Sequence, residues 1–268
     1  MGVPNPLSFH VLDDLALADA EGLLHQVPVG IPYGIDALGP LMEFLHLASG
    51  NRLPHPVSGG WVNLNGASTL IAALESGANT WIAPKHGRFG FAKIVSTDED
   101  PELLLTNFFM NMKRAAQKVS GIPSVIAGQL VGALGELKGN ILDHSGAPET
   151  GIVVYRSSPG LLEFVAADRG IGVLSSLRSQ GAFPLLTDYG EALSLTLQEG
   201  TSCYGVGKGR GFGFRTLFLG LLNLNGLLRF RSGDHALVMD GTSPNLASAQ
   251  LIQKAFIDGF LVSVRIQA

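Results

Sequence analysis

The spacing of apolar residues between positions 124 and 146 predicts a long amphipathic helix. Apolar side chains recur there every three or four residues and form one stripe that faces a core: Ile126, Leu130, Leu134, Leu137 and Ile141. A polar line with the same spacing lies roughly 120° round the helix, at the border of that core: Glu136, Asn140 and Asp143. Four glycines also fall within this helix, and each weakens it unless packing or a ligand requires it: Gly128, Gly132, Gly135 and Gly139.

Alternation of apolar and polar residues predicts strands at 151–158 and 162–170, which are joined by a Pro-Gly turn as in a hairpin. A second hairpin is predicted at 226–233 and 235–241, and a last strand at 260–266. Similar patterns predict the remaining elements: strands at 61–64, 80–84 and 88–96, and helices at 67–77, 102–121 and 212–224. Residues 174–206 have no strong period, so we expect a long connection with a short helix around 189–198.

This order of elements predicts an α+β protein, a two-layer α/β sandwich with helices over one face of a mixed, mostly antiparallel sheet. The segment 96–102 is polar and contains a proline, so it is the best candidate for a domain boundary. We therefore expect a small N-terminal α/β domain of unknown role at 1–98 and a second domain at 99–268.

Composition narrows the possible partners. The net charge of −4 argues against a dedicated nucleic-acid binder, and the single cysteine excludes an intrachain disulfide. No secretory signal and no membrane-spanning run is visible, so we expect a cytoplasmic protein with no membrane partner. Yet the interval between Glu199 and Asp234 has no acidic residue and carries five cations, which suits a small anionic ligand: Lys208, Arg210, Arg215, Arg229 and Arg231.

The stretch "GVGKGRGFGF" (205–214) places a glycine at every second position, with Lys208 and Arg210 between them. Such a loop lets the backbone approach a ligand closely and aim several N–H groups at an anion. Its spacing matches neither the P-loop nor the dinucleotide-binding motif. It runs directly into an apolar, helix-like segment, so a flexible linker is the weaker interpretation.

Three motifs, in this order along the chain, resemble the GHKL superfamily of ATPases and kinases. "ELKGNILDHS" (136–145) is similar to its asparagine box, "DRGIGV" (168–173) to its D-x-G-x-G box and "GRGFGF" (209–214) to its glycine-rich lid. "GLLRFRSG" (226–233) also resembles the strand that follows the lid in the kinases of the family. The resemblance covers about residues 124–268 and implies the Bergerat fold, with ATP and Mg²⁺ as cofactors.

The resemblance also implies roles for single residues. Asp168 would accept a hydrogen bond from the adenine amine, while Gly170 and Gly172 keep side chains away from the base. Asn140 would bind Mg²⁺ and Glu136 would act as general base, with Asp143 beside them in the nucleotide site. The lid would contact the phosphates through its glycine amides and two cations: Lys208, Gly209, Arg210, Gly211 and Gly213.

One departure from the family is Phe260, which stands where many members have a threonine near the phosphates. The phosphoacceptor box of histidine kinases is also missing. Three functions remain open: a slow Mg²⁺-dependent ATPase or nucleotide-gated switch, which we favour, a serine/threonine kinase of the anti-sigma-factor type, and a non-catalytic nucleotide-dependent binding module. Each implies ATP or ADP as a ligand, and the first implies a protein partner or self-association.

Overall fold

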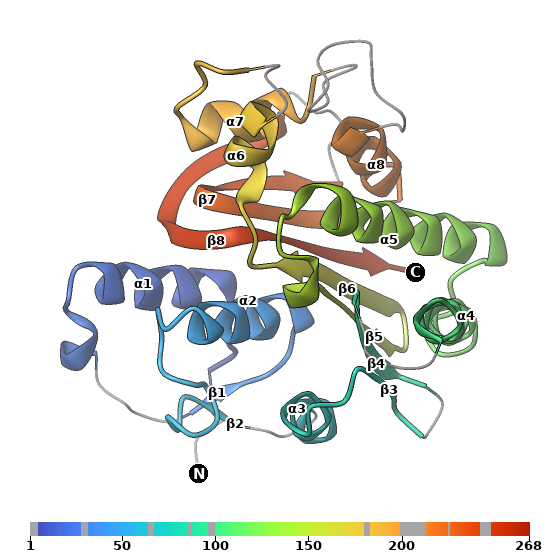
Figure 1. Cartoon of the computed structure of the whole chain (residues 1–268). Coiled ribbons are helices and arrows are strands. Elements are labelled where there is room, and N and C mark those ends of the chain that lie inside the picture. Colours follow the sequence, from blue (N-terminus) through green and yellow to red (C-terminus); the bar gives the residue numbers. More distant parts are fainter. Residues whose placement is uncertain are drawn as a thin grey trace.

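The computed structural model of the chain describes residues 5–27, 32–63, 67–84, 87–95, 100–179, 183–198, 213–224, 226–241 and 248–268. The α+β class predicted from the sequence is confirmed (Figure 1). A six-stranded sheet has the order β3-β4-β5-β6-β8-β7, and each of its five pairings is antiparallel. The parallel pairing lies apart from it, in a small sheet of β1 and β2.

The strands are β1 Tyr33–Gly34, β2 Val62–Asn63, β3 Thr80–Ile82, β4 Phe89–Lys93, β5 Ile152–Ser158, β6 Leu161–Asp168, β7 Gly226–Asp240 and β8 Gln250–Gln267. The α-helices are α1 Phe9–Ala20, α2 Leu38–Ser49, α3 Ser68–Glu75, α4 Pro101–Lys118, α5 Ser124–His144, α6 Gly172–Ser179, α7 Tyr189–Leu195 and α8 Gly213–Leu222.

The first face of the large sheet is covered by α4, α5 and α8. Leu130, Leu134, Leu137 and Ile141 of α5 are fully buried, as the apolar stripe predicted, while Ile126 is partly buried against the same core. Local signals fix the ends of these helices: the Asp100 side chain accepts a hydrogen bond from the Leu103 N–H, and Pro101 occupies the first turn of α4.

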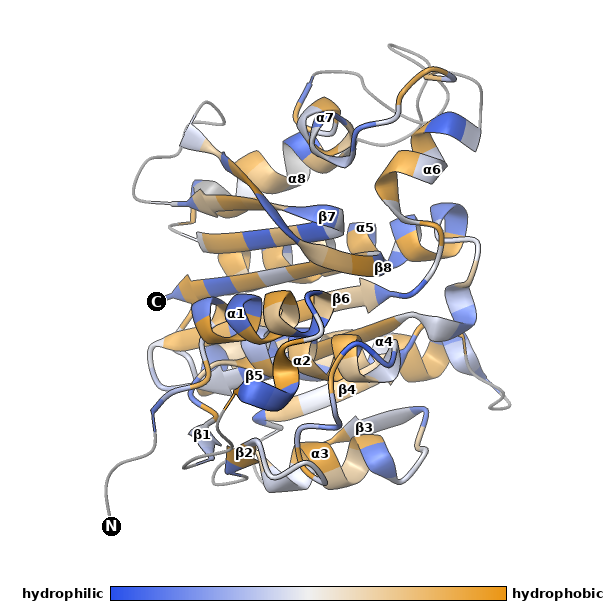
Figure 2. Cartoon of the chain, turned by 90° about the vertical axis from the view of Figure 1, so that its left-hand side faces the viewer, coloured by the Kyte–Doolittle hydropathy of each residue, from blue (hydrophilic) through white to orange (hydrophobic). Residues whose placement is uncertain are grey.

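The second face of the sheet also carries helices, which the sequence did not lead us to expect. Seen from that side, α1 and α2 lie in front of the strands, with α5 and α8 behind them (Figure 2). These helices enclose a second core together with strand residues whose side chains point to this face: Val154, Val165, Ala167 and Leu261. Strands β3 and β4, which precede residue 98, pair into the same sheet as β5, so the sheet is continuous across the expected boundary.

The predicted hairpin at 226–241 is wrong, because these residues form the single long strand β7. Gly233 has a φ of +60° and sits where the register with β8 shifts, so it makes a bulge instead of a turn. Strand β8 accordingly begins at Gln250, ten residues before the predicted start. Helix α6 was also missed, since eight residues are too few to show a period.

Candidate functional site

Asp168 is a buried carboxylate at the very end of β6, with 1% of its surface exposed. Its Oδ1 accepts a hydrogen bond from the Gly170 N–H at 2.7 Å. Its Oδ2 is also buried and has no hydrogen-bond partner among the residues that the structure describes. Burial raises the pKa of this carboxyl to about 6, although the Gly170 N–H acts in the opposite direction. The site therefore offers one unused acceptor oxygen.

Three glycines allow the backbone to close around this carboxylate. A Cβ on Gly170 would overlap the Ser145 carbonyl oxygen, and one on Gly259 would overlap the Asp168 carbonyl oxygen. Gly172 and Gly259 have φ values of +72° and +65°, a region that side chains disfavour. Gly170 and Gly172 are the two glycines of the D-x-G-x-G motif. Gly259, on β8, directly precedes Phe260, but the sequence analysis gave it no role.

Ser232 connects the three chain segments around Asp168. This buried side chain donates to the Gly259 carbonyl at 2.8 Å and accepts from the Val173 N–H at 3.0 Å. It therefore joins β7 to β8 and to the start of α6. The sequence held a signal for it, since Ser232 is the serine of "GLLRFRSG", but we gave it no role.

The polar line of α5 lies on the side of the sheet that Asp168 faces. Glu136 and Asp143 are exposed and Asn140 is half-buried, as expected for a line that borders the core. Among the described residues, no hydrogen bond or ion pair joins this line to Asp168. Helix α5, which carries these carboxylate and amide oxygens, lies beside α8 (Figure 1).

These oxygens suit Mg²⁺, which takes one or two protein ligands and completes its shell with phosphates and water. Within the described ranges, no group of three or more His, Cys, Asp or Glu side chains forms a metal centre. A shared site with few protein ligands, such as Asn140 with phosphates, does not need such a group.

Most of the predicted lid lies outside the residues that the structure describes. Lys208, Gly209, Arg210 and Gly211 lie outside the described residues, whereas Gly213 is the first residue of α8. Next to it, the Phe214 ring packs on Phe230 of β7, with ring centroids 4.8 Å apart, and lies 6.2 Å from Phe260 of β8.

Phe260 pairs directly with Asp168 across β6 and β8, so the two side chains lie on the same face of the sheet. The first turn of α8 therefore contacts the residue that pairs with Asp168 across the sheet.

No family model matches this chain, and no curated protein matches it. In the part of the chain that the structure describes, no helix is long and apolar enough to cross a membrane.

Proposed function

We propose that the protein binds ATP, with Asp168 as the acceptor for the adenine amine. The observation that carries the proposal is the unpartnered, buried Oδ2 of this residue. A buried acceptor without a hydrogen bond costs about 1–3 kcal/mol, and more when it is charged. Proteins retain such a group where it serves a ligand, and an exocyclic amine supplies the N–H that Oδ2 lacks.

The surroundings of Asp168 support a flat aromatic ligand. Gly170 and Gly259 keep side chains off the carboxylate, since a Cβ on either would meet its Oδ1. Phe260 and Phe214 lie on the same face and are apolar. A planar base with an amine at its edge matches this pairing of one acceptor with an aromatic surface.

The phosphates and the ion belong to the part of the proposal that rests on the sequence motifs. Asn140 of α5 would hold Mg²⁺, which when bound neutralises charge on the phosphates. Lys208 and Arg210, with the glycine amides around them, would bind the phosphates themselves. The loop ends at α8, whose Phe214 contacts Phe230 of β7 and Phe260 of β8, so phosphate binding in the loop would be transmitted to these strands.

In this proposal ATP acts as a switch, and Glu136 either activates water slowly or takes no part in chemistry. Glu136 is exposed on α5, one helical turn before Asn140, so water reaches it freely. A protein partner, or a second copy of the chain, would respond to the nucleotide-bound state.

The first test is a thermal-shift titration with ATP, ADP and GTP, with and without Mg²⁺. ATP at about 100 times its Kd should stabilise the protein by roughly 2.7 kcal/mol. We expect Asp168→Asn to remove this shift, because the new amide presents a donor to the adenine amine. Asp100→Asn is the matched control, since it makes the same charge change at the cap of α4. No shift with any nucleotide in the wild type would refute the proposal.

Phosphate release then separates the ATPase from the binding module. An ATPase should lose most of its release rate in Glu136→Gln while its ATP affinity is kept. Glu21→Gln, at the exposed end of α1, is the control for the charge change. If the wild type bound ATP but released no phosphate, hydrolysis would be excluded and the protein would act only as a nucleotide-dependent switch.

A further inference from the structure

We propose that α2 positions Asp168, by holding from the opposite face of the sheet the backbone segments that enclose the carboxylate. This inference deepens the proposed function, because it makes the N-terminal region part of the control of that same site. The residues involved are positioning residues, since none of them touches the carboxylate itself.

Two contacts at the C-terminal half of α2 reach the segments on either side of the carboxylate. His46 Nε2 lies 2.9 Å from the carbonyl oxygen of Asp258, the residue before Gly259. Arg169, the residue after Asp168, donates from Nη1 to the Ser49 carbonyl at 2.8 Å. One end of one helix is thus bonded to both backbone turns that close around the acceptor.

A third contact, one turn earlier on α2, reaches the strand that carries Ser232. The buried Glu43 carboxylate accepts from Arg229 Nε at 2.9 Å and also pairs with Arg231. Arg231 directly precedes Ser232, whose hydroxyl bonds both Gly259 and Val173.

Because Glu43, His46 and Ser49 are three residues apart, they lie on one side of α2. That side therefore contacts all three segments around Asp168.

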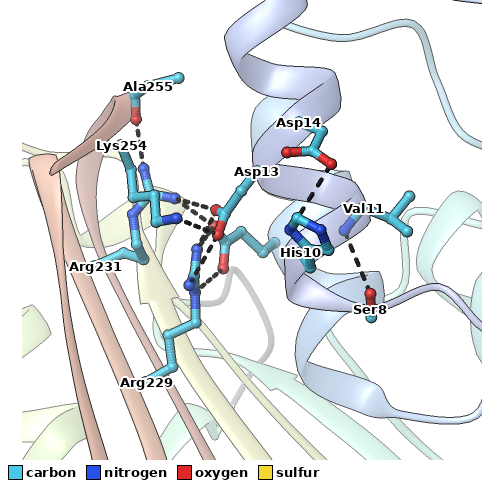
Figure 3. Close-up of polar contacts among 10 residues, drawn as sticks. Ser8, His10, Val11, Asp13, Asp14, Arg229, Arg231, Lys254 and Ala255 are labelled. Atoms are coloured by element: carbon cyan, nitrogen blue, oxygen red, sulfur yellow. Dashed lines mark hydrogen bonds and ion pairs between the residues drawn. The ribbon is translucent and has the colours of Figure 1, made fainter. Parts of the chain in front are cut away.

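A buried ion-pair network also attaches α1 and α2 to the sheet. Figure 3 shows Arg229, Arg231 and Lys254 reaching from the strands toward Asp13 of α1. Lys254 Nζ lies 2.8 Å from Asp13, and the Arg229 guanidinium also stacks over Phe9.

This buried network joins both helices to β7 and β8 through several short contacts, so it favours one register of the helices on the sheet. By linkage, a ligand that stabilises the site around Asp168 also stabilises the packing of α2 on the sheet. Conversely, a partner that displaces α1 and α2 lowers the affinity for the ligand.

The test compares two arginines that make the same contact in different places. Arg169 donates to Ser49 of α2 near Asp168, and Arg156 donates from Nη1 to the Asp36 carbonyl at 2.9 Å. Arg156 lies on β5, far along the sheet from the carboxylate. Arg169→Ala and Arg156→Ala each remove one hydrogen bond between the sheet and the N-terminal region. Arg156→Ala also removes an ion pair with Glu163 and a stack on Phe89, so it is the more disruptive of the two.

The first readout is amide hydrogen exchange, which needs no nucleotide. In Arg169→Ala we expect the Gly170 and Val173 amides to exchange roughly 10-fold faster, a change of about 1.4 kcal/mol. Arg169→Lys should restore most of the protection, and Arg156→Ala should leave both amides as in the wild type. Unchanged exchange in Arg169→Ala, or equal acceleration in Arg156→Ala, would overturn the proposal.

The second readout is the Kd for ATP at a temperature where each variant is folded. Arg169→Ala and His46→Phe should each weaken ATP at least about 5-fold, the lower range of coupling between sites. His46→Gln, which keeps a hydrogen-bonding group, should recover part of this loss.

Should the wild type not bind ATP, the proposed function fails, and the exchange measurement still decides whether α2 positions Asp168. Equal ATP affinity in Arg169→Ala, Arg156→Ala and wild type would overturn the coupling to the ligand.

Discussion

Two of the buried carboxylates, one on each face of the sheet, have opposite surroundings. On the second face, Glu43 of α2 is surrounded by Arg229 and Arg231, which use both of its oxygens. On the first face, Asp168 has one backbone N–H and an oxygen without a partner among the described residues. Burial is nearly complete for both.

The pKa values follow the partners and not the burial. Burial alone would raise the pKa of Glu43, but the two arginines hold it below its usual value. Burial raises the pKa of Asp168 to about 6, because no cation opposes it. A fully paired buried acid joins elements together, whereas an acid with a strongly perturbed pKa beside glycine-rich backbone suits a binding site. We therefore propose attachment for Glu43 and recognition for Asp168.

The largest effect should come from breaking the paired site. We expect Glu43→Gln to lower the free energy of unfolding by about 3–5 kcal/mol, because it leaves two buried arginines with too little negative charge. For a chain of this size the Tm should fall by roughly 6 to 20 °C. Urea denaturation at pH 7 measures the first quantity, and differential scanning calorimetry the second.

The control for Glu43→Gln is Asp14→Asn, on the exposed side of α1. Its carboxylate lies 3.7 Å from His10, and both side chains are largely in water. We expect a change within about 0.5 kcal/mol. A loss below about 1 kcal/mol in Glu43→Gln would mean that Asp13 alone satisfies the arginines, and the contrast between the faces would disappear.

The contacts of Glu43 with Arg229 and Arg231 were not predicted from the sequence. Glu43 sits in an apolar run, "LMEFLHL", where a single acid carries no motif, and its partners are 186 and 188 residues away. Arg229 and Arg231 were noticed, but the lack of acidic residues between Glu199 and Asp234 favoured an anionic ligand. Buried ion pairs between distant elements depend on the tertiary fold, which local patterns do not encode.

The second-largest effect comes from Asp168 and concerns how stability depends on pH. Its sign is opposite to that of a salt-bridged carboxylate. The folded protein holds a proton on Asp168 up to about pH 6, whereas the ordinary pKa of an aspartate in an unfolded chain is 3.8. The stability of the wild type should therefore fall as the pH rises from about 4 to 6 and then level off. We expect Asp168→Asn, which does not titrate, to be more stable than the wild type at pH 7.5 by about 1–3 kcal/mol.

Urea denaturation of both proteins between pH 4 and 7.5, without nucleotide, checks this sign. The two curves should meet near pH 4, and Asp100→Asn should follow the wild type throughout, because Asn and Asp cap helices equally well. An Asp168→Asn protein that is less stable at pH 7.5 would show that Oδ2 already has a donor in the unliganded protein.

The helix and the motif near Asp168 could be predicted from the sequence, whereas the residues that close around its carboxylate from other strands could not. The stripe and the polar line of α5 were predicted from spacing, because one helix repeats its own period over many residues. Asp168, Gly170 and Gly172 are adjacent in sequence and were found together. Gly259 and Ser232 close the same site from β8 and β7, and only the pairing of those strands brings them there.

The smallest effect concerns glycines, which also divide into two kinds. A Cβ on Gly132, Gly135 or Gly139 of α5 would meet nothing within 4 Å, whereas one on Gly259 would overlap Asp168. We expect Gly135→Ala to stabilise the protein by about 0.5–1 kcal/mol, because alanine restricts the unfolded chain and favours a helix.

Gly259→Ala should act in the opposite direction, since its φ is positive and its space is filled. Urea denaturation compares the two, and the ATP Kd of Gly135→Ala should stay within about twofold of the wild type. If Gly135→Ala stabilised the protein but raised its Kd for ATP more than twofold, the open face of α5 would be covered in the nucleotide-bound state. The glycines there would then belong with Asp168, as groups kept free for something that binds.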